Sequence, residues 1–213
     1  MAAKQYEEIT ILECASTKNL SGKRHTRLID ALFNMIMQKD IKTAIHCKNV
    51  AEYSVRLGKK LGLNTVQLQL LRDGARLHDI GKIMVDISAL NKRSKLNDRE
   101  LLQVRSHPKE GMKLLTSFRV AEEITDIAWH HHERWDGKGY PDGMKGEEIP
   151  YLVRIVCICD AIDAMASNRP YRHKMEKDNI LKQLKDGSGT QFDPEMTEVA
   201  IEMIENGKMG LYG

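Results

Sequence analysis

The sequence predicts an all-α fold, and three observations support this prediction. Apolar residues recur along most of the 213-residue chain with the spacing of one face of an α-helix. Strand signals are weak: only residues 9–15 could form a short strand, and the same run could equally begin a helix. The one long stretch unsuited to a continuous helix is 134–150, which contains four glycines and two prolines.

The N-terminal part of the chain contains one amphipathic segment. Leu28, Leu32 and Met35, followed by Ile36 or Met37, are spaced roughly as on one side of a helix. We therefore interpret residues 1–40 as a short N-terminal helical appendage. Its apolar stripe needs some apolar surface to cover it, so it is expected either to pack on the rest of the chain or to pair with a second copy.

The remaining residues, 41–213, are predicted to form a single all-α domain. A helix is expected from His46 to Leu61, and Gly62 would end it. Asn97 precedes another helical pattern, and Pro194 suits the first turn of the last one. The later helices are expected at residues 68–78, 98–105, 124–131, 151–166 and 194–206.

Composition excludes several classes of function. Hydrophobic residues make up 41% and charged residues 30%, as in an ordinary globular protein, and the net charge of +3 is too small to indicate binding of a nucleic acid polymer. No run approaches the roughly 20 apolar residues of a membrane helix, and the N-terminus has no secretory signal pattern. The four cysteines form no CxxC motif or disulfide framework, so a cytoplasmic location is expected.

Histidines and aspartates gather in a way that indicates a metal centre. His78 and Asp79 are adjacent, and a carboxylate can bridge two metals because it has two oxygens. His131 and His132 are also adjacent, and Asp160 lies one helical turn before a second aspartate. His46 and His107 lie in separate helical segments that could converge on the same cavity, whereas His25 and His173 are not expected to bind metal. Imidazole ligands suit Fe, Mn, Ni and Zn.

The chain resembles the HD-GYP domain, a group within the HD phosphohydrolases, over about residues 40–196. Asp40 and Thr43 precede His46 in the pattern DxxTxxH that such domains often show. The motifs that follow in order are HDIGK at 78–82, HHERWDGKGYP at 131–141, CDAID at 159–163 and NRPYR at 168–172.

The resemblance implies an HD-domain helical bundle around a metal centre that holds two divalent ions, with Fe, Mn or Ni expected. Asp79 would bridge the ions, and the resemblance does not assign each histidine to one metal. The implied metal ligands are His46, His78, Asp79, His107, His131, His132 and Asp160. The implied catalytic residues are Asp79 and Lys82, where Lys82 would contact the phosphate or protonate the leaving oxygen. The implied substrate contacts are Lys82, Tyr140, Arg169 and Arg172.

One position departs from the pattern of some family members. A glutamate four residues before the first histidine can support a third metal, and this chain has Lys42 at that place. On a helix Lys42 shares a face with His46. An ammonium group repels a cation, so two metals are expected rather than three.

The resemblance implies a phosphodiesterase that hydrolyses cyclic di-GMP to linear pGpG or onward to GMP. Two metals about 3.5–4 Å apart would activate a bridging hydroxide for attack on phosphorus. Three alternatives stay open: hydrolysis of a related dinucleotide such as cyclic GMP-AMP, a metal-bound signalling or binding module with little turnover, and another HD phosphohydrolase that acts on nucleotides. A homodimer or a partner signalling protein is compatible with the resemblance.

Overall fold

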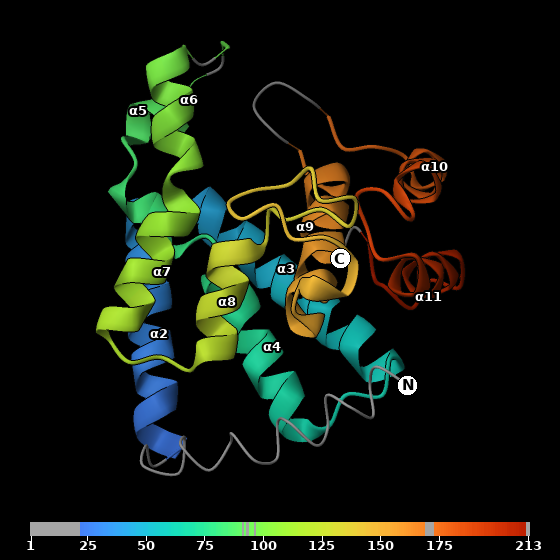
Figure 1. Cartoon of the computed structure of the whole chain (residues 1–213), viewed down its shortest axis with the longest axis horizontal. Helices are drawn as coiled ribbons and strands as arrows, with labels where there is room; N and C mark the ends of the chain where they lie inside the picture. The colour runs from blue at the N-terminus through green and yellow to red at the C-terminus, as the bar shows by residue number, and fades with distance from the viewer. Residues whose placement is uncertain (1–21, 91, 93, 96, 169–172, 212–213) are drawn as a thin grey trace.

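The computed structural model describes residues 22–90, 92, 94–95, 97–168 and 173–211. The possible strand at 9–15 therefore lies outside the described residues. Within them the chain forms helices joined by loops, with isolated bridges but no β-strand (Figure 1). The predicted all-α fold is confirmed.

The helices follow one another closely along the chain. The first half contains α2 (Gly22–Lys39), α3 (Ile41–Lys60), α4 (Thr65–Leu77), the 3-10 helix η2 (Ile80–Met84), α5 (Ile87–Leu90) and α6 (Asp98–Arg105). The second half contains α7 (His107–Ser117), α8 (Glu122–His130), the 3-10 helix η3 (Gly146–Glu148), α9 (Tyr151–Ala166), α10 (Lys177–Gly187) and α11 (Pro194–Glu205).

Side-chain caps define where several of these helices begin. Asp40 accepts hydrogen bonds from the first backbone N–H groups of α3, and Asn64 and Asn97 do the same for α4 and α6. Asn97 confirms the predicted start of α6. These caps satisfy N–H groups that have no partner inside the helix, so each helix start is fixed locally.

Helix α9 lies in the middle of the bundle, where α3, α4, α8, α10 and α11 contact it (Figure 1). Leu152, Ile155 and Ile158 have at most 1% of their surface exposed. A helix that is apolar on most sides is stable only when other helices surround it. Of its few polar positions, Asp163 is therefore buried inside the molecule, whereas Asp160 is half-buried.

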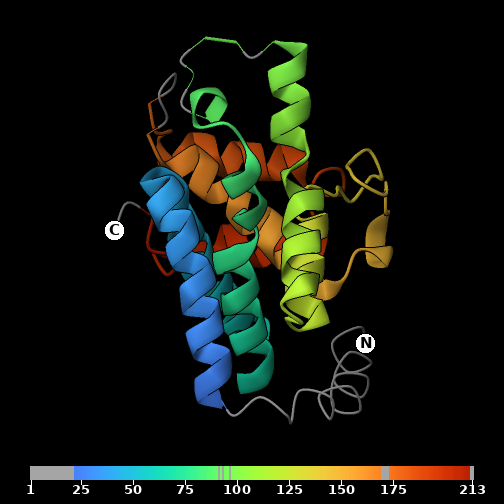
Figure 2. The same ribbon diagram turned by 90° about the vertical axis from the view of Figure 1, so that its left-hand side faces the viewer.

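Helix α2 packs on the bundle, beside α3 and α4 (Figure 2). Its buried face contains Ile29, Leu32 and Ile36, each 1% exposed, whereas Met35 is 41% exposed. The predicted stripe was wrong at Met35, because positions 29, 32 and 36 define a helix face that excludes position 35. The buried face of α2 thus packs on the other helices of the same chain. The division at residue 40 into an appendage and a domain stays a prediction.

No helix in the described part of the chain combines the length and the apolar character needed to cross a membrane.

Candidate metal centre

Asp79 lies at the centre of the site and directs its two oxygens at two different groups of imidazoles. Its Oδ2 is 3.8 Å from Nε2 of His46 and 3.5 Å from Nε2 of His78. Its Oδ1 is 3.3 Å from Nε2 of His107 and 3.8 Å from Nε2 of His131. The carboxylate is buried. This is the geometry that a carboxylate bridging two cations requires.

The first group combines imidazoles from α3 and the end of α4 with a carboxylate from α9. Ligand atoms of His46, His78 and Asp79 lie within 4.8 Å of one another, close enough to surround one ion. Asp160 adds an oxygen 3.0 Å from Nε2 of His46. Nitrogen and carboxylate donors in this mixture suit a divalent transition metal.

The second group consists of three imidazoles beside Oδ1 of Asp79. Nε2 of His107 lies 3.1 Å from Nε2 of His131 and 3.2 Å from Nε2 of His132. Burial lowers the pKa of His107 to about 4, and it lowers the pKa of His131 and of His132 as well. The three rings are therefore neutral near pH 7, the form that binds a metal.

The outer nitrogens of the rings decide which nitrogen faces the centre. Nδ1 contacts a backbone carbonyl oxygen three residues earlier in three cases: His78 to Ala75 at 2.8 Å, His107 to Val104 at 2.6 Å, and His131 to Ala128 at 3.1 Å. A carbonyl only accepts, so Nδ1 carries the hydrogen and a neutral ring presents a lone pair at Nε2. Lone pairs that converge this closely repel one another unless a cation lies between them. The residues present thus fit a pair of metal ions.

Asp163 holds the remaining ring of the first group. Its Oδ2 accepts a 2.6 Å hydrogen bond from Nδ1 of His46, and its Oδ1 accepts from Asn49 and Ser167. Burial lowers the pKa of His46, but the hydrogen bonds to Asp160 and Asp163 outweigh it and raise this pKa to about 9. No role was predicted for Asp163, although its spacing of one helical turn from Asp160 indicates that both lie on the same side of α9.

Lys82 lies at the edge of the centre. Its Nζ donates a 2.6 Å hydrogen bond to Oδ2 of Asp79. Burial would raise the pKa of Asp79, but Lys82 and the surrounding imidazoles lower it well below its usual value. The bridging carboxylate is therefore ionised. The structure thus places Lys82 beside the candidate metal centre.

Gly81 explains how the HDIGK motif reaches α7. A Cβ at Gly81 would collide with the carbonyl oxygen of His107 and with the backbone nitrogen of Gly111. Only glycine lets η2 approach the first turn of α7 this closely. That approach brings His107 to Asp79.

The loop after His132 is anchored by Glu133. Its Oε1 accepts hydrogen bonds from the backbone N–H groups of Asp142 and Gly143, at 2.7 and 3.0 Å. Gly139 touches the backbone of 132–134, where a Cβ would collide. The loop is therefore folded back against the residues that carry the imidazoles.

The ring of Tyr140 contacts His132, one of the candidate metal-binding residues. It is stacked on His132 with centroids 4.8 Å apart, and the guanidinium of Arg105 lies 5.7 Å from the Tyr140 centroid. Tyr140 was predicted to contact the substrate, and in the structure its ring supports an imidazole of the centre. Its role as a substrate contact stays a prediction. Arg105 was not identified from the sequence.

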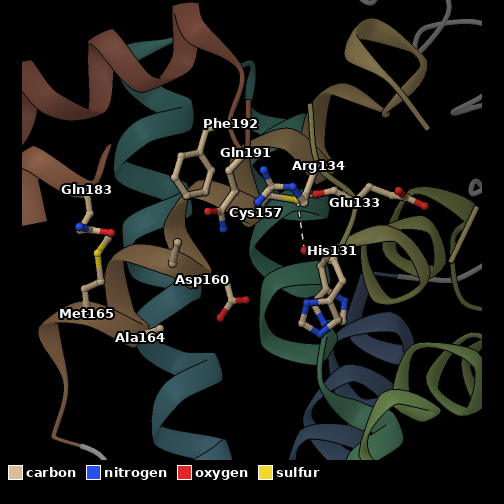
Figure 3. A pocket seen from close by; sticks show the side chains of 12 residues that line it. His131, Glu133, Arg134, Cys157, Asp160, Ala164, Met165, Gln183, Gln191 and Phe192 are labelled. Atoms are coloured by element: carbon tan, nitrogen blue, oxygen red, sulfur yellow. Dashed lines mark hydrogen bonds between the residues drawn. The ribbon is translucent and has the colours of Figure 1, made fainter. Parts of the chain in front are cut away.

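A cavity of about 380 Å³ opens beside the centre. Its lining includes His132 together with His131, Asp160, Arg134 and Phe192, and the last four are labelled in Figure 3. This size is in the range of ligand-binding sites.

Two predicted substrate contacts cannot be placed. Arg169 and Arg172 lie outside the described residues.

Lys42 is exposed near the start of α3, one turn before His46.

Comparison with known proteins decides the family. The family model described as HD domain matches residues 12–196. The chain belongs to the HD domain family. The HD-GYP resemblance of its motifs is thereby confirmed.

This HD-domain chain is 32% identical over 177 residues to the 3'3'-cGAMP-specific phosphodiesterase 2 of Vibrio cholerae, a match that covers 82% of this chain and 34% of the relative. It is 34% identical over 188 residues to the cyclic di-GMP phosphodiesterase response regulator RpfG of Xanthomonas campestris pv. campestris, covering 87% of this chain and 50% of RpfG. The HD-domain chain thus spans half or less of the length of these two relatives.

The fold of the HD-domain chain is shared with Bd1817, an HDG"Y"P protein from Bdellovibrio bacteriovorus. The TM-score is 0.66 at 21% identity, and the match covers 87% of this chain and 65% of that one. This likeness shows the fold alone.

Proposed function

We propose that the chain is a metal-dependent phosphodiesterase that hydrolyses cyclic di-GMP to linear pGpG, with GMP as a further product. The observation that carries this proposal is the placement of Asp79, with one oxygen toward His46 and His78 and the other toward His107 and His131. Such an arrangement suits a two-metal centre, which is a common device for phosphoryl chemistry.

In this proposal each oxygen of Asp79 belongs to one metal site. The residues of the first site are His46, His78, Asp79 and Asp160, and those of the second are Asp79, His107, His131 and His132. Divalent ions supply activation of water and stabilisation of charge on the phosphoryl oxygens when they are bound. Fe, Mn or Ni is the proposed metal.

Residues of the chain itself hold and orient the substrate. The ammonium of Lys82, already beside Asp79, would contact a phosphoryl oxygen or donate a proton to the leaving oxygen. Arg169 and Arg172 would hold the phosphate or the guanine, because a guanidinium matches both. Tyr140 would border the same pocket through its place on His132.

Cyclic GMP-AMP is the second candidate substrate. It is supported by the 32% identity to a relative named as 3'3'-cGAMP-specific, whereas the 34% identity to RpfG supports cyclic di-GMP. The HHERWDGKGYP motif argues against the third candidate function, a phosphohydrolase that acts on simple nucleotides.

A turnover assay separates these functions. The full chain is incubated with Fe, Mn or Ni and with cyclic di-GMP, cyclic GMP-AMP or a mononucleotide, and the products are resolved by chromatography. We expect cyclic di-GMP to be cleaved at the highest kcat/KM. Tight binding of cyclic di-GMP without cleavage under all three metals would instead establish a signalling or binding module.

Metal number has its own test. Two ions are expected, because Lys42 occupies the position from which a glutamate could support a third. Metal analysis of the purified protein should give two ions per chain, and Lys42→Glu should allow a third. Three ions in the parent protein would refute this count.

A cytoplasmic location and a homodimer or partner signalling protein stay predictions, to be tested by fractionation and light scattering.

A further inference from the structure

The cavity beside the metal centre has a wall that the proposed chemistry does not use. Along α9, Cys157, Ala161 and Ala164 line it at helical spacing, and the small alanines leave the space open. Phe192 forms part of the opposite side with its ring (Figure 3). The cavity of about 380 Å³ adjoins the proposed two-metal centre, and its size and mixed apolar and polar lining suit a nucleobase.

Arg134 supplies the fixed polar group of this wall. Its Nε and Nη2 donate to the carboxylate of Asp136 at 3.0 and 2.8 Å, which locks the plane of the guanidinium. Nη1 has no acceptor among the residues that the structure describes, so its N–H groups are available to a ligand. The side chain is 34% exposed, which gives a ligand access to it.

The charge of Arg134 favours a base over a phosphate. Asp136 neutralises the guanidinium, since the pKa of Asp136 is lowered to about 2 by its hydrogen bonds with Arg134. A neutral pair has little attraction for a phosphate anion, yet it still donates hydrogen bonds to neutral acceptors. Guanine offers two such acceptors, O6 and N7, and adenine offers a donor in place of O6.

Gln191 completes the polar part of the wall. The segment 135–136 is tied to 190–191 by backbone hydrogen bonds, from Trp135 to Gln191 at 3.3 Å and from Asp136 to Thr190 at 2.8 Å. These bonds keep the turn that carries Gln191 next to the loop that carries Arg134. The exposed amide of Gln191 has no hydrogen-bond partner among the described residues, and its oxygen can accept from the N–H groups of guanine.

We propose that this cavity is a guanine-recognition site, in which Arg134 contacts the O6 and N7 edge and Gln191 the N–H edge, while Phe192 and the alanines of α9 enclose the ring. The inference deepens the proposed function, because it presumes that the ligand is a guanine nucleotide whose phosphate lies at the metal centre. It makes Arg134 a determinant of specificity rather than of hydrolysis.

Binding of GMP and AMP tests the site without any turnover. Both nucleotides carry the same ribose phosphate, so the ratio of their dissociation constants, measured by calorimetry on the Mn-loaded full chain, reports the base alone. We expect GMP to bind at least about 10-fold more tightly than AMP. Arg134→Met should weaken the binding of GMP about 10- to 100-fold, whereas the affinity for AMP should change little. Arg99→Met, an exposed arginine on α6, should leave both values unchanged.

A second variant tests the cavity independently of the loop. Ala164→Leu keeps a good helix former in α9 and fills the space, so GMP and AMP should both bind at least about 10-fold more weakly while metal content is retained. Equal affinity of the parent for GMP and AMP would overturn the proposal, and so would parent-like GMP binding by Ala164→Leu. Cyclic di-GMP hydrolysis without a GMP preference would reject this inference alone. A GMP preference without hydrolysis would reject only the enzymatic proposal.

Discussion

Asp163 accepts a 2.6 Å hydrogen bond from Nδ1 of His46, which turns the opposite nitrogen of the ring toward Asp79 and Asp160. The two residues are 117 positions apart and lie on α3 and α9. Asp163 is itself buried and receives further hydrogen bonds from Asn49 and Ser167. Its carboxylate therefore fixes both the orientation and the tautomer of His46.

Asp163→Asn should weaken metal binding at the first site. An amide can donate to Nδ1 and so favour the ring with its hydrogen on Nε2, which cannot bind a metal. Loss of such an outer partner typically costs about 10- to 100-fold in metal affinity or activity. Titration of metal into the variant measures it. Ser167→Ala, which removes another partner of Asp163, should bind metal normally, and equal losses in both variants would point to general disruption of the fold.

Asp79→Ala should abolish turnover and reduce metal content, because one carboxylate contributes to both sites. Metal analysis and the cyclic di-GMP assay on the same preparation give the two results. Asp86→Ala, an exposed aspartate seven residues later, should match the parent. Two retained ions and a near-normal rate in Asp79→Ala would show that the bridge is assigned to the wrong residue.

Lys82→Met should lower kcat by about 10²- to 10⁴-fold, the range expected when a group that transfers a proton is lost. Metal content and KM should change much less, because the interaction is made mainly in the transition state. Lys92→Met is the matched control, since the Lys92 side chain is 30% exposed and that of Lys82 25%. A rise in KM at constant kcat would instead make Lys82 a substrate-binding residue.

Arg169→Ala and Arg172→Ala should each raise KM for cyclic di-GMP about 10- to 100-fold, as the loss of a charge-assisted hydrogen bond predicts. Steady-state kinetics measures the effect, and metal content should not change, because neither residue is a proposed ligand. Arg99→Ala serves as the control. Parent-like kinetics in both variants would refute substrate recognition through the NRPYR motif.

Leu32→Ala should lower the free energy of unfolding by about 2–5 kcal/mol, because a side chain only 1% exposed would leave a cavity. Met35→Ala, on the 41% exposed side chain of the same helix, should change it by less than about 0.5 kcal/mol. Urea denaturation of the full chain measures both values. Similar values for the two variants would contradict the packing of α2 against the bundle.

Much of the fold follows from patterns within a few residues. The helix predicted at 151–166 is α9 (Tyr151–Ala166), and the one predicted at 98–105 is α6 with its cap at Asn97. Caps and helical periodicity are local properties, so the sequence displays them directly. The face of α2 was harder to predict, because several apolar residues in a row fit more than one stripe and only the neighbouring helices select which is buried.

Local patterns in the amino-acid sequence establish the helical class, the family motifs and the set of residues from which a metal centre could be built. Tertiary structure decided how that set is arranged: which oxygen of Asp79 faces which imidazoles, that Asp163 orients His46, and that Tyr140 stacks on His132. Most of these arrangements join residues that are far apart along the chain, so no local pattern displays them. The side chains of the centre come from α3, α4, α7, the end of α8 and α9, and only the packing of these helices around a shared core brings their ligand atoms within reach of one another.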